Sequence, residues 1–384
     1  MKIFHTGDWH IGKLVNGFYM TEDQRYILSQ LCDEIEKENP DVLLIAGDVY
    51  DRSIPPVEAI ELLNETLKKI IIDLKTPVIL IAGNHDSNER IEFGSSLYEA
   101  CNFYVSGELK SEIKKINLKD KDGIVNFYLI PYADPYYVRK LYNEESIKTH
   151  DDALKKILEN IDLNKDERNV AIFHGYVAKD SEKIIESDSE KRLSIGGTEV
   201  IKSSHFKDFN YTALGHIHSP QRVDGENIRY SGSLMKYSFS EMNNKVGITK
   251  IELNGDGDVT VTRIPFKLMR DYREIRGELS ELISKEFIQT QKIDDYIKVT
   301  LTDKGEVIEP MQKLREVYPN VMELRNESRL KELNMEEESI AQLKEKSILE
   351  LTCDFFSSIR EDEITDEELA LVKSVLEEVE REDK

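Results

Sequence analysis

Five short apolar runs share one pattern, because each is followed at once by Asp, Asn or His. They begin at Lys2, Val42, Val78, Val170 and Tyr211. A continuous apolar run bounded by a turn signal is typical of a strand that is buried on both faces. In parallel sheets, chemistry gathers just past the carboxyl ends of the strands. The pattern therefore predicts five buried strands that deliver polar side chains to one edge of a sheet.

Segments with helical spacing separate these strands, and two hairpins follow. Residues 21–37 and 57–74 have apolar positions at helical intervals, and prolines open the second segment. Residues 110–131 indicate a hairpin with an Asp-Gly turn, and residues 246–264 indicate another. Strands that alternate with helices imply an α/β fold, here with added hairpins of α+β character.

The composition changes after about Met269. Residues 271–326 predict a small α+β unit, with strands near 296–302 and 321–324 and a helix near 309–318. From Ser328 onward, 18 Asp and Glu face 8 Lys and Arg, so the net charge is 8 − 18 = −10. We expect three parts: a domain over 1–270, a second over 271–326, and acidic C-terminal helices over 327–384.

The overall composition is that of a water-soluble protein, with 33% charged residues and a net charge of −23 over 384 residues. Three widely spaced cysteines form no disulfide framework. No apolar run approaches the roughly 18 residues of a membrane span, and no signal peptide is evident, so we expect a cytoplasmic protein without a membrane segment. The acidic charge argues against a freestanding nucleic-acid binder. Bound metal ions or a partner could still supply positive charge.

Histidines are concentrated at the predicted strand ends. Five of the eight lie there: His10, His85, His174, His216 and His218. Together with nearby carboxylates and an amide they give seven candidate metal ligands: Asp8, His10, Asp48, Asn84, His174, His216 and His218. One tetrahedral zinc takes four ligands, whereas seven suit two ions that share a carboxylate, for which Asp48 is the natural candidate. Such pairs, about 3.5–4 Å apart, catalyse phosphoester hydrolysis.

His85 is expected to act differently from the ligands. It lies between Asn84 and Asp86, where ligation by Asn84 would direct its ring at a bound phosphate. A histidine there can protonate the leaving oxygen or stabilise its charge. Asp51 is a candidate to orient it, although a local turn role before Pro55 is the alternative. His5, within its strand, is expected to be structural.

The order of these motifs resembles that of the calcineurin-like metallophosphoesterase superfamily over about the first 265 residues. The motifs are Asp8-x-His10, Gly47-Asp48-x-x-Asp51, Gly83-Asn84-His85-Asp86, His174 and Gly215-His216-x-His218. The resemblance implies a β-sandwich flanked by helices, instead of a single doubly wound sheet. It also implies that Asp8, His10, Asp48 and His218 hold one metal and that Asp48, Asn84, His174 and His216 hold the other. His85 would be the catalytic histidine.

Narrower motifs lie at residues 47–51, 130–133, 214–221 and 231–241. Through them the chain resembles, within that superfamily, the SbcD-type nuclease subunits. The resemblance implies two Mn²⁺ ions, with Mg²⁺ or another divalent ion as the alternative, and exonuclease and hairpin endonuclease activity on double-stranded DNA. It also implies a homodimer, a capping domain that faces DNA, and an SMC-like ATPase partner of the SbcC type bound through the C-terminal helices.

Two other functions compete with this interpretation. A phosphomonoesterase or cyclic-nucleotide phosphodiesterase would have the same site without needing residues 271–384. A non-catalytic scaffold of the same fold would usually lack several ligands or the catalytic histidine, whereas all are present here. The apolar stripe of the C-terminal helices could also pack onto the body of the chain instead of a partner.

Overall fold

The computed structural model describes most of the chain and divides it into two compact units. The described residues are 1–179, 184–190, 199–305 and 307–327, with Thr365, Leu369 and Val372. The first unit is Met1–Glu274 with Lys292–Lys298, and the second is Ile275–Gln291 with Val299–Lys384. The predicted C-terminal helices over 327–384 lie almost wholly outside the described residues, as does part of the polar segment around 181–197.

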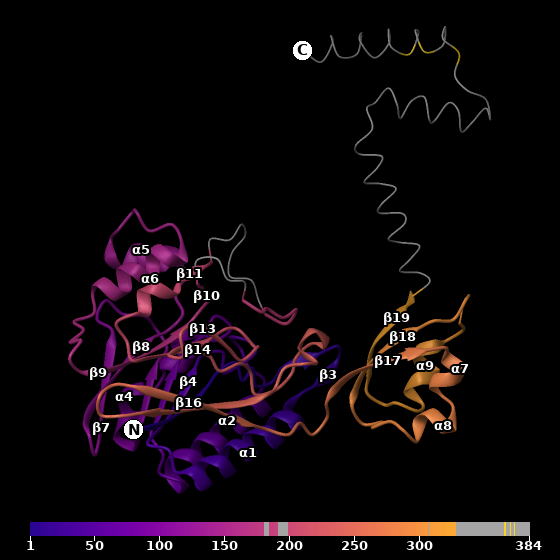
Figure 1. The fold of residues 1–384 in the computed structure, drawn as a ribbon, viewed down its shortest axis with the longest axis horizontal. Coiled ribbons are helices and arrows are strands. Elements are labelled where there is room, and N and C mark those ends of the chain that lie inside the picture. Colours follow the sequence, from indigo (N-terminus) through magenta and orange to yellow (C-terminus); the bar gives the residue numbers. More distant parts are fainter. Residues whose placement is uncertain are drawn as a thin grey trace. The chain divides into compact units, whose positions relative to one another are not determined.

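The first unit contains two six-stranded sheets (Figure 1). The first sheet has the order β16 (Val259–Pro265), β15 (Gly247–Leu253), β1 (Lys2–Thr6), β4 (Val42–Ala46), β5 (Val78–Ile81) and β6 (Phe103–Ser106). Strands β1, β4, β5 and β6 are parallel, and the β15–β16 hairpin joins them antiparallel to β1. Three of the five predicted strands, β1, β4 and β5, are therefore neighbours in this sheet.

The second sheet holds the other two predicted strands. Its order is β13 (Gln221–Asp224), β14 (Ile228–Tyr230), β12 (Tyr211–Gly215), β9 (Arg168–His174), β8 (Gly123–Ile130) and β7 (Lys114–Asp120). Strands β14, β12, β9 and β8 are parallel, and the predicted hairpin is β7–β8. The expectation of one sheet edge was wrong, because parallel pairing joins strands that are distant in sequence and adjacent apolar runs do not reveal their partners.

The two sheets pack face to face through a buried apolar layer. Ile3, Leu44 and Ile79 from the first sheet contact a cluster that includes Phe127 and Ile172 from the second. All five are completely or almost completely buried. This arrangement is the β-sandwich that the family resemblance predicted, and it explains why the strands are apolar on both faces.

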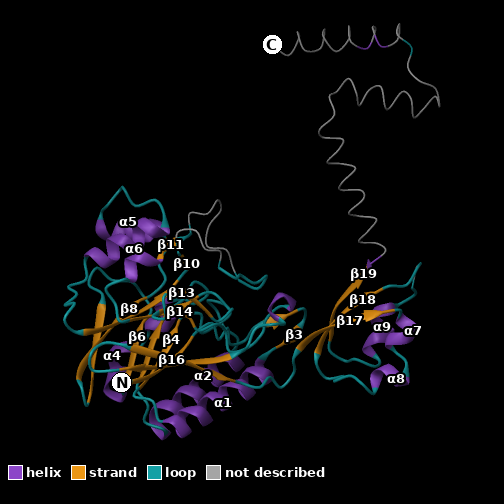
Figure 2. Ribbon diagram, viewed as in Figure 1, coloured by secondary structure: helices purple, strands orange, loops and turns teal. Residues whose placement is uncertain are grey.

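Helices cover the outer faces of the sandwich (Figure 2). They are α1 (Thr21–Glu38), α2 (Val57–Lys68), α3 (Asn88–Glu92), α4 (Ser95–Tyr98), α5 (Pro135–Tyr142) and α6 (His150–Glu159). Helices α1 and α2 lie together beside the first sheet, whereas Val138 of α5 and Leu154 of α6 pack against Tyr128 and Phe173 on the second. A π-helical turn, Lys69–Asp73, extends α2 over the range predicted as one helix.

Smaller elements complete the described chain. In the first unit these are the β2 (Leu14–Val15) and β3 (Phe18–Tyr19) hairpin and the parallel pair β10 (Val177–Ala178) and β11 (Ile201–Lys202). A three-stranded sheet follows, with β17 (Tyr272–Gly277), β18 (Tyr296–Leu301) and β19 (Val321–Asn326). The last helices are α7 (Leu279–Leu282), α8 (Lys285–Ile288) and α9 (Pro310–Arg315). Of the described helices, none is long and apolar enough to cross a membrane.

Candidate metal centre

Strand register brings the predicted ligands to neighbouring positions. Thr6 pairs with Ile45, and Ala46 pairs with Ile81, so β1, β4 and β5 end side by side. In the second sheet, Gly215 pairs with His174. The loops after β1 and β4 also run together, since the N–H of Asp8 donates to Gly47 O at 3.0 Å and that of His10 to Asp48 O at 2.9 Å.

One group of donors gathers Asp8, His10 and His218. One ligand atom from each lies within 4.8 Å of the others. The Nε2 atoms of His10 and His218 are 3.1 Å apart. Two imidazole nitrogens that bind one cation at about 2.0–2.1 Å must lie roughly 3 Å apart, so this spacing suits a shared ion.

A second group gathers Asp48, Asn84, His174 and His216. Asn84 Oδ1 lies 2.9 Å from His174 Nε2 and 3.1 Å from His216 Nδ1. Asp48 Oδ2 lies 3.4 Å from His174 Nε2 and 3.7 Å from His10 Nε2. The same carboxylate oxygen therefore lies between the two groups, in the position of a bridging ligand.

Asp8 and Asp48 each keep one carboxylate oxygen available for a cation. Asp48 Oδ1 accepts the backbone N–H of His85 at 2.8 Å, which leaves Oδ2 between the histidines. Asp8 Oδ1 accepts the N–H of His216 at 2.8 Å, and Asp8 Oδ2 is buried without a hydrogen-bond partner. A buried oxygen of this kind is costly unless a ligand pairs with it, so the donor set fits divalent cations.

The backbone is strained where the ligands lie. Four of the seven predicted ligands have positive φ: Asp8 (53°), His10 (44°), Asp48 (49°) and His216 (104°). Residues with a Cβ seldom adopt this region, at a cost of roughly 1–3 kcal/mol each, and such strain clusters at functional sites. The surrounding structure thus holds these side chains in positions that an unstrained loop would not give.

Glycines allow the two sheets to meet at the site. A Cβ on Gly47 would collide with His174 Nδ1, one on Gly83 with the Asp48 carboxylate, and one on Gly215 with the Ala46 carbonyl oxygen. These three contacts join the ends of different strands. The glycines that close the predicted strands are therefore required by the close approach of the backbones.

Charges in the site are paired without any metal. Burial lowers the pKa of His174, but the Asp48 carboxylate outweighs this effect and raises the pKa to about 9. Burial also lowers the pKa of His218, but the Glu241 carboxylate outweighs this effect and raises the pKa to about 9. Burial and His174 lower the pKa of His216 to about 3, and burial raises that of Asp8 to about 7. Divalent cations would therefore displace protons from this centre.

His85 lies beside both groups without belonging to the predicted ligand set. Its Nδ1 faces the backbone carbonyl oxygen of Asp51 at 2.8 Å, and its ring meets that of His10 edge-on at 4.7 Å between centroids. The Asp51 carboxylate does not make that hydrogen bond but accepts one from Lys13 Nζ at 2.6 Å. Asp51 thus contacts His85 through its main chain, an arrangement that the sequence could not reveal.

Several residues around the site were missed by sequence reasoning. Glu241 Oε1 lies 3.1 Å from His218 Nδ1, and Ser189 Oγ lies 2.8 Å from the same atom. Glu241 belongs to the 231–241 motif, so a signal was present, whereas Ser189 falls in a segment interpreted only as a polar excursion. His5 bonds Tyr211 and Leu214 inside the sandwich, in agreement with a structural role.

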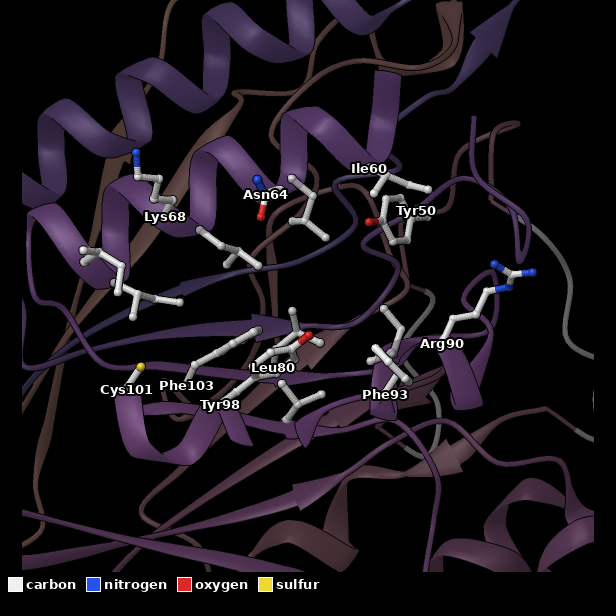
Figure 3. Close-up of a pocket in the computed structure, with 16 residues that line it drawn as sticks. Tyr50, Ile60, Asn64, Lys68, Leu80, Arg90, Phe93, Tyr98, Cys101 and Phe103 are labelled. Carbon is white, nitrogen blue, oxygen red and sulfur yellow. The ribbon is translucent and has the colours of Figure 1, made fainter. Parts of the chain in front are cut away.

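A separate apolar hollow lies away from these donors (Figure 3). Its volume is about 430 Å³, and Ile60, Phe93, Tyr98 and Phe103 are among the residues that line it. None of the seven predicted ligands, all within the described chain, lines this hollow. The candidate metal centre is therefore separate from this apolar hollow.

Comparisons with known proteins identify the families that the chain resembles. Residues 1–220 match the family described as calcineurin-like phosphoesterase, and residues 268–359 match the type 5 capsule protein repressor C-terminal domain. The chain is 38% identical over 326 residues to the SbcD subunit of the nuclease SbcCD of Staphylococcus epidermidis, and the match covers 85% of each chain.

Two solved structures are similar at low sequence identity. GAP50, the anchor in the inner membrane complex of Plasmodium, has a TM-score of 0.40 and 13% identity, with 84% of this chain and 96% of that chain covered. A dimetal phosphatase from Danio rerio has a TM-score of 0.36 and 11% identity, with 68% and 98% covered.

Proposed function

Because this chain belongs to the calcineurin-like phosphoesterase family and is a relative of the SbcD nuclease subunits, we propose that it processes DNA ends. It is a metal-dependent phosphodiesterase of the nuclease type. In our proposal it is an Mn²⁺-dependent exonuclease and hairpin endonuclease on double-stranded DNA. It works as the nuclease component of an ATP-dependent complex.

The observation that carries this proposal is the position of Asp48 Oδ2 between His10 and His174, at 3.7 and 3.4 Å. A bridging carboxylate is what two adjacent cations require. We assign Asp8, His10, Asp48 and His218 to one ion. Asp48, Asn84, His174 and His216 hold the other. When bound, the two ions would act as Lewis acids on the phosphodiester and clamp its reacting oxygens.

His85 is proposed as the proton donor to the leaving oxygen. The Asp51 carbonyl at 2.8 Å from Nδ1 fixes the ring and keeps a proton on that nitrogen. The other nitrogen, Nε2, is then the one that delivers a proton when the ring is charged. Asp51 serves this step as a positioning residue, through its main chain.

The parts of the chain are proposed to divide the work. Residues 1–270 form the nuclease domain, 271–326 the capping domain that faces DNA, and 327–384 the helices that dock the SMC-like ATPase. The first compact unit, which ends at Glu274 apart from Lys292–Lys298, lies close to the first of these divisions. Because the net charge is −23, much of the DNA affinity would come from the partner, and binding by the chain alone would be weak and salt-sensitive.

A homodimer is proposed through exposed apolar residues on the first unit. They include Ile54, Val57, Phe93 and Leu97, exposed by 72%, 69%, 79% and 76%. Large exposed apolar side chains can mark interaction surfaces, and a symmetric dimer would bring two metal centres into one assembly.

The test is cleavage of linear and hairpin double-stranded DNA with Mn²⁺, by the chain alone and with its ATPase partner. His85→Gln should bind metal and fold, yet lose about 100- to 10,000-fold in cleavage rate, because proton donation is removed. Unchanged cleavage by this variant would contradict the role of His85. Hydrolysis of para-nitrophenyl phosphodiesters without any DNA cleavage would indicate a small-molecule phosphodiesterase.

A further inference from the structure

The ring of His218 is held from both sides. Its Nε2 faces His10 Nε2 at 3.1 Å, inside the proposed metal centre. Its Nδ1 points the other way, with Glu241 Oε1 at 3.1 Å and Ser189 Oγ at 2.8 Å. The backbone N–H of His218 donates to Glu190 Oε1 at 2.7 Å. Both the ring and the main chain of this residue therefore have acidic partners behind them.

Glu241 is itself locked in place. Its side chain is completely buried, its Oε2 accepts the N–H of Tyr237 at 2.9 Å, and its Oε1 accepts the hydroxyl of Ser187 at 2.9 Å. A buried carboxylate is costly unless it is paired and hydrogen-bonded. Among its described contacts, the basic partner of this carboxylate is the imidazole of His218, whose Nδ1 lies 3.1 Å from Glu241 Oε1.

His174 provides the contrast within the same molecule. Its outer nitrogen, Nδ1, faces the neutral backbone carbonyl of Ala46 at 2.8 Å, while Nε2 faces the ligands Asp48 and Asn84. Both arrangements keep a proton on Nδ1 and direct Nε2 inward, so that Nε2 is the nitrogen that would bind a cation. They differ in the distance to a carboxylate: Glu241 Oε1 lies 3.1 Å from His218 Nδ1, within hydrogen-bonding distance, whereas Asp8 Oδ1 lies 4.0 Å from His174 Nδ1.

We propose that Glu241 is a positioning residue for the metal site of His218. It keeps the proton on Nδ1, so that the Nε2 lone pair faces the cation, and its charge makes the imidazole a stronger donor. The half of the centre that contains His218 therefore binds its divalent ion first and more tightly than the half that contains His174. This inference rests on the dinuclear centre of the proposed function and deepens it.

The experiment titrates the full chain with Mn²⁺ alone, at neutral pH and without DNA, and follows free Mn²⁺ by electron paramagnetic resonance. The wild type should bind two ions per chain with two different affinities. Glu241→Ala should weaken the tighter site by about 10- to 100-fold, the usual cost of removing such a partner. Glu241→Gln should weaken it less, because the amide oxygen still accepts from Nδ1 but carries no charge.

Glu92→Gln is the matched control. Glu92 also accepts hydrogen bonds, from Gly107 N at 2.8 Å and from Lys110 at 2.8 Å, but none of its hydrogen bonds reaches the metal centre. Both Mn²⁺ affinities should be unchanged in this variant. Ser189→Ala removes the second partner of Nδ1 while leaving the carboxylate, and should weaken the tighter site less than Glu241→Ala does.

Thermal unfolding in a chelator separates positioning from folding. If Glu241→Ala fails to fold, the glutamine variant decides the question. If folded Glu241 variants bind both ions as tightly as the wild type, the positioning role of Glu241 is wrong, but the dinuclear centre still stands. A wild type that binds no Mn²⁺ would overturn the dinuclear centre, and this inference with it.

Discussion

The two sheets of the first unit supply different chemistry to the same centre. The loops after β1, β4 and β5 bring the oxygen donors Asp8, Asp48 and Asn84, with His10. The strands β9 and β12 bring only imidazoles: His174, His216 and His218. In the proposed assignment, neither sheet supplies all four ligands of one ion. The centre therefore forms only when the two sheets pack against each other.

The sheets also differ in how they present these groups. Asp8, His10 and Asp48 lie in loops with positive φ, whereas His174 is the last residue of a regular strand. The strained loops position acidic groups against one another, which costs energy in the absence of a cation. The regular strand β9 brings the His174 ring to the contact without such strain, and of the second sheet's ligands only His216 has a positive φ. The first sheet therefore carries most of the strain of the site.

The largest loss of activity is expected from removing the charge of Asp48, the carboxylate that lies between the two groups of ligands. Asp48→Asn should lower phosphodiester hydrolysis by more than about 1,000-fold, since several kilocalories per mole of charge stabilisation are lost. Mn²⁺ binding should weaken at both sites. Steady-state kinetics and metal titration check this prediction. Loss of only one ion would show that Asp48 does not bridge the sheets.

The next largest effect is expected on stability, from disturbing the contact between the ends of β12 and β4. Gly215→Ala places a methyl group against the Ala46 carbonyl oxygen, so we expect a loss of about 3 kcal/mol in the free energy of unfolding. Gly7→Ala is the matched control, because its Cβ meets Ala46 at an ordinary 3.5 Å and should change stability by less than about 1 kcal/mol. Chemical denaturation of both variants measures the difference. Equal losses would mean that the contact at Gly215 is not special.

A smaller effect is expected at the opposite end of the strands. Asp120 of β7 binds Arg168 of β9 through two hydrogen bonds, at 2.7 and 2.9 Å, and lies 2.8 Å from the amino group of Met1 before β1. Arg168 holds the pKa of Asp120 well below its usual range. Asp120→Asn should therefore cost about 2 kcal/mol at pH 7.

The sign of the pH dependence follows from that lowered pKa. The unfolded carboxyl has a pKa of about 3.9, so the stabilisation is complete above this pH and declines as the pH falls towards the lower folded value. The difference between wild type and Asp120→Asn, measured by urea unfolding, should shrink from pH 7 to pH 3. A difference that stays constant would mean that the charge of Asp120 contributes nothing.

Much of the fold could be predicted because its signals are local. The runs that begin at Val42 and Val78 are apolar throughout and end in Gly-Asp and Gly-Asn, so both strands and their polar ends are visible in a few residues. The division between two sheets was not visible, because β1 pairs with β15 and β12 pairs with β9 over long distances in sequence. The family resemblance, and not the pattern, supplied the sandwich.

The surroundings of the site could not be predicted for a related reason. Glu241 becomes a partner of His218 only when a short turn after β14 folds beneath it. Asp51 meets His85 through a carbonyl oxygen, which every residue type has, so its side chain gave no information about this contact. Sequence patterns identify residue types at strand ends, whereas the atoms that they use depend on the folded backbone.

The order of the elements along the chain has a consequence for synthesis. Asp8 and His10 leave the ribosome early, but His216 and His218 follow about 210 residues later. At roughly 5–20 residues per second, that interval lasts about 10 to 40 seconds. During this time the growing chain has its carboxylates but lacks His216 and His218, so in the proposed assignment neither ion would have its full set of ligands until the strand β12 and the loop after it are made.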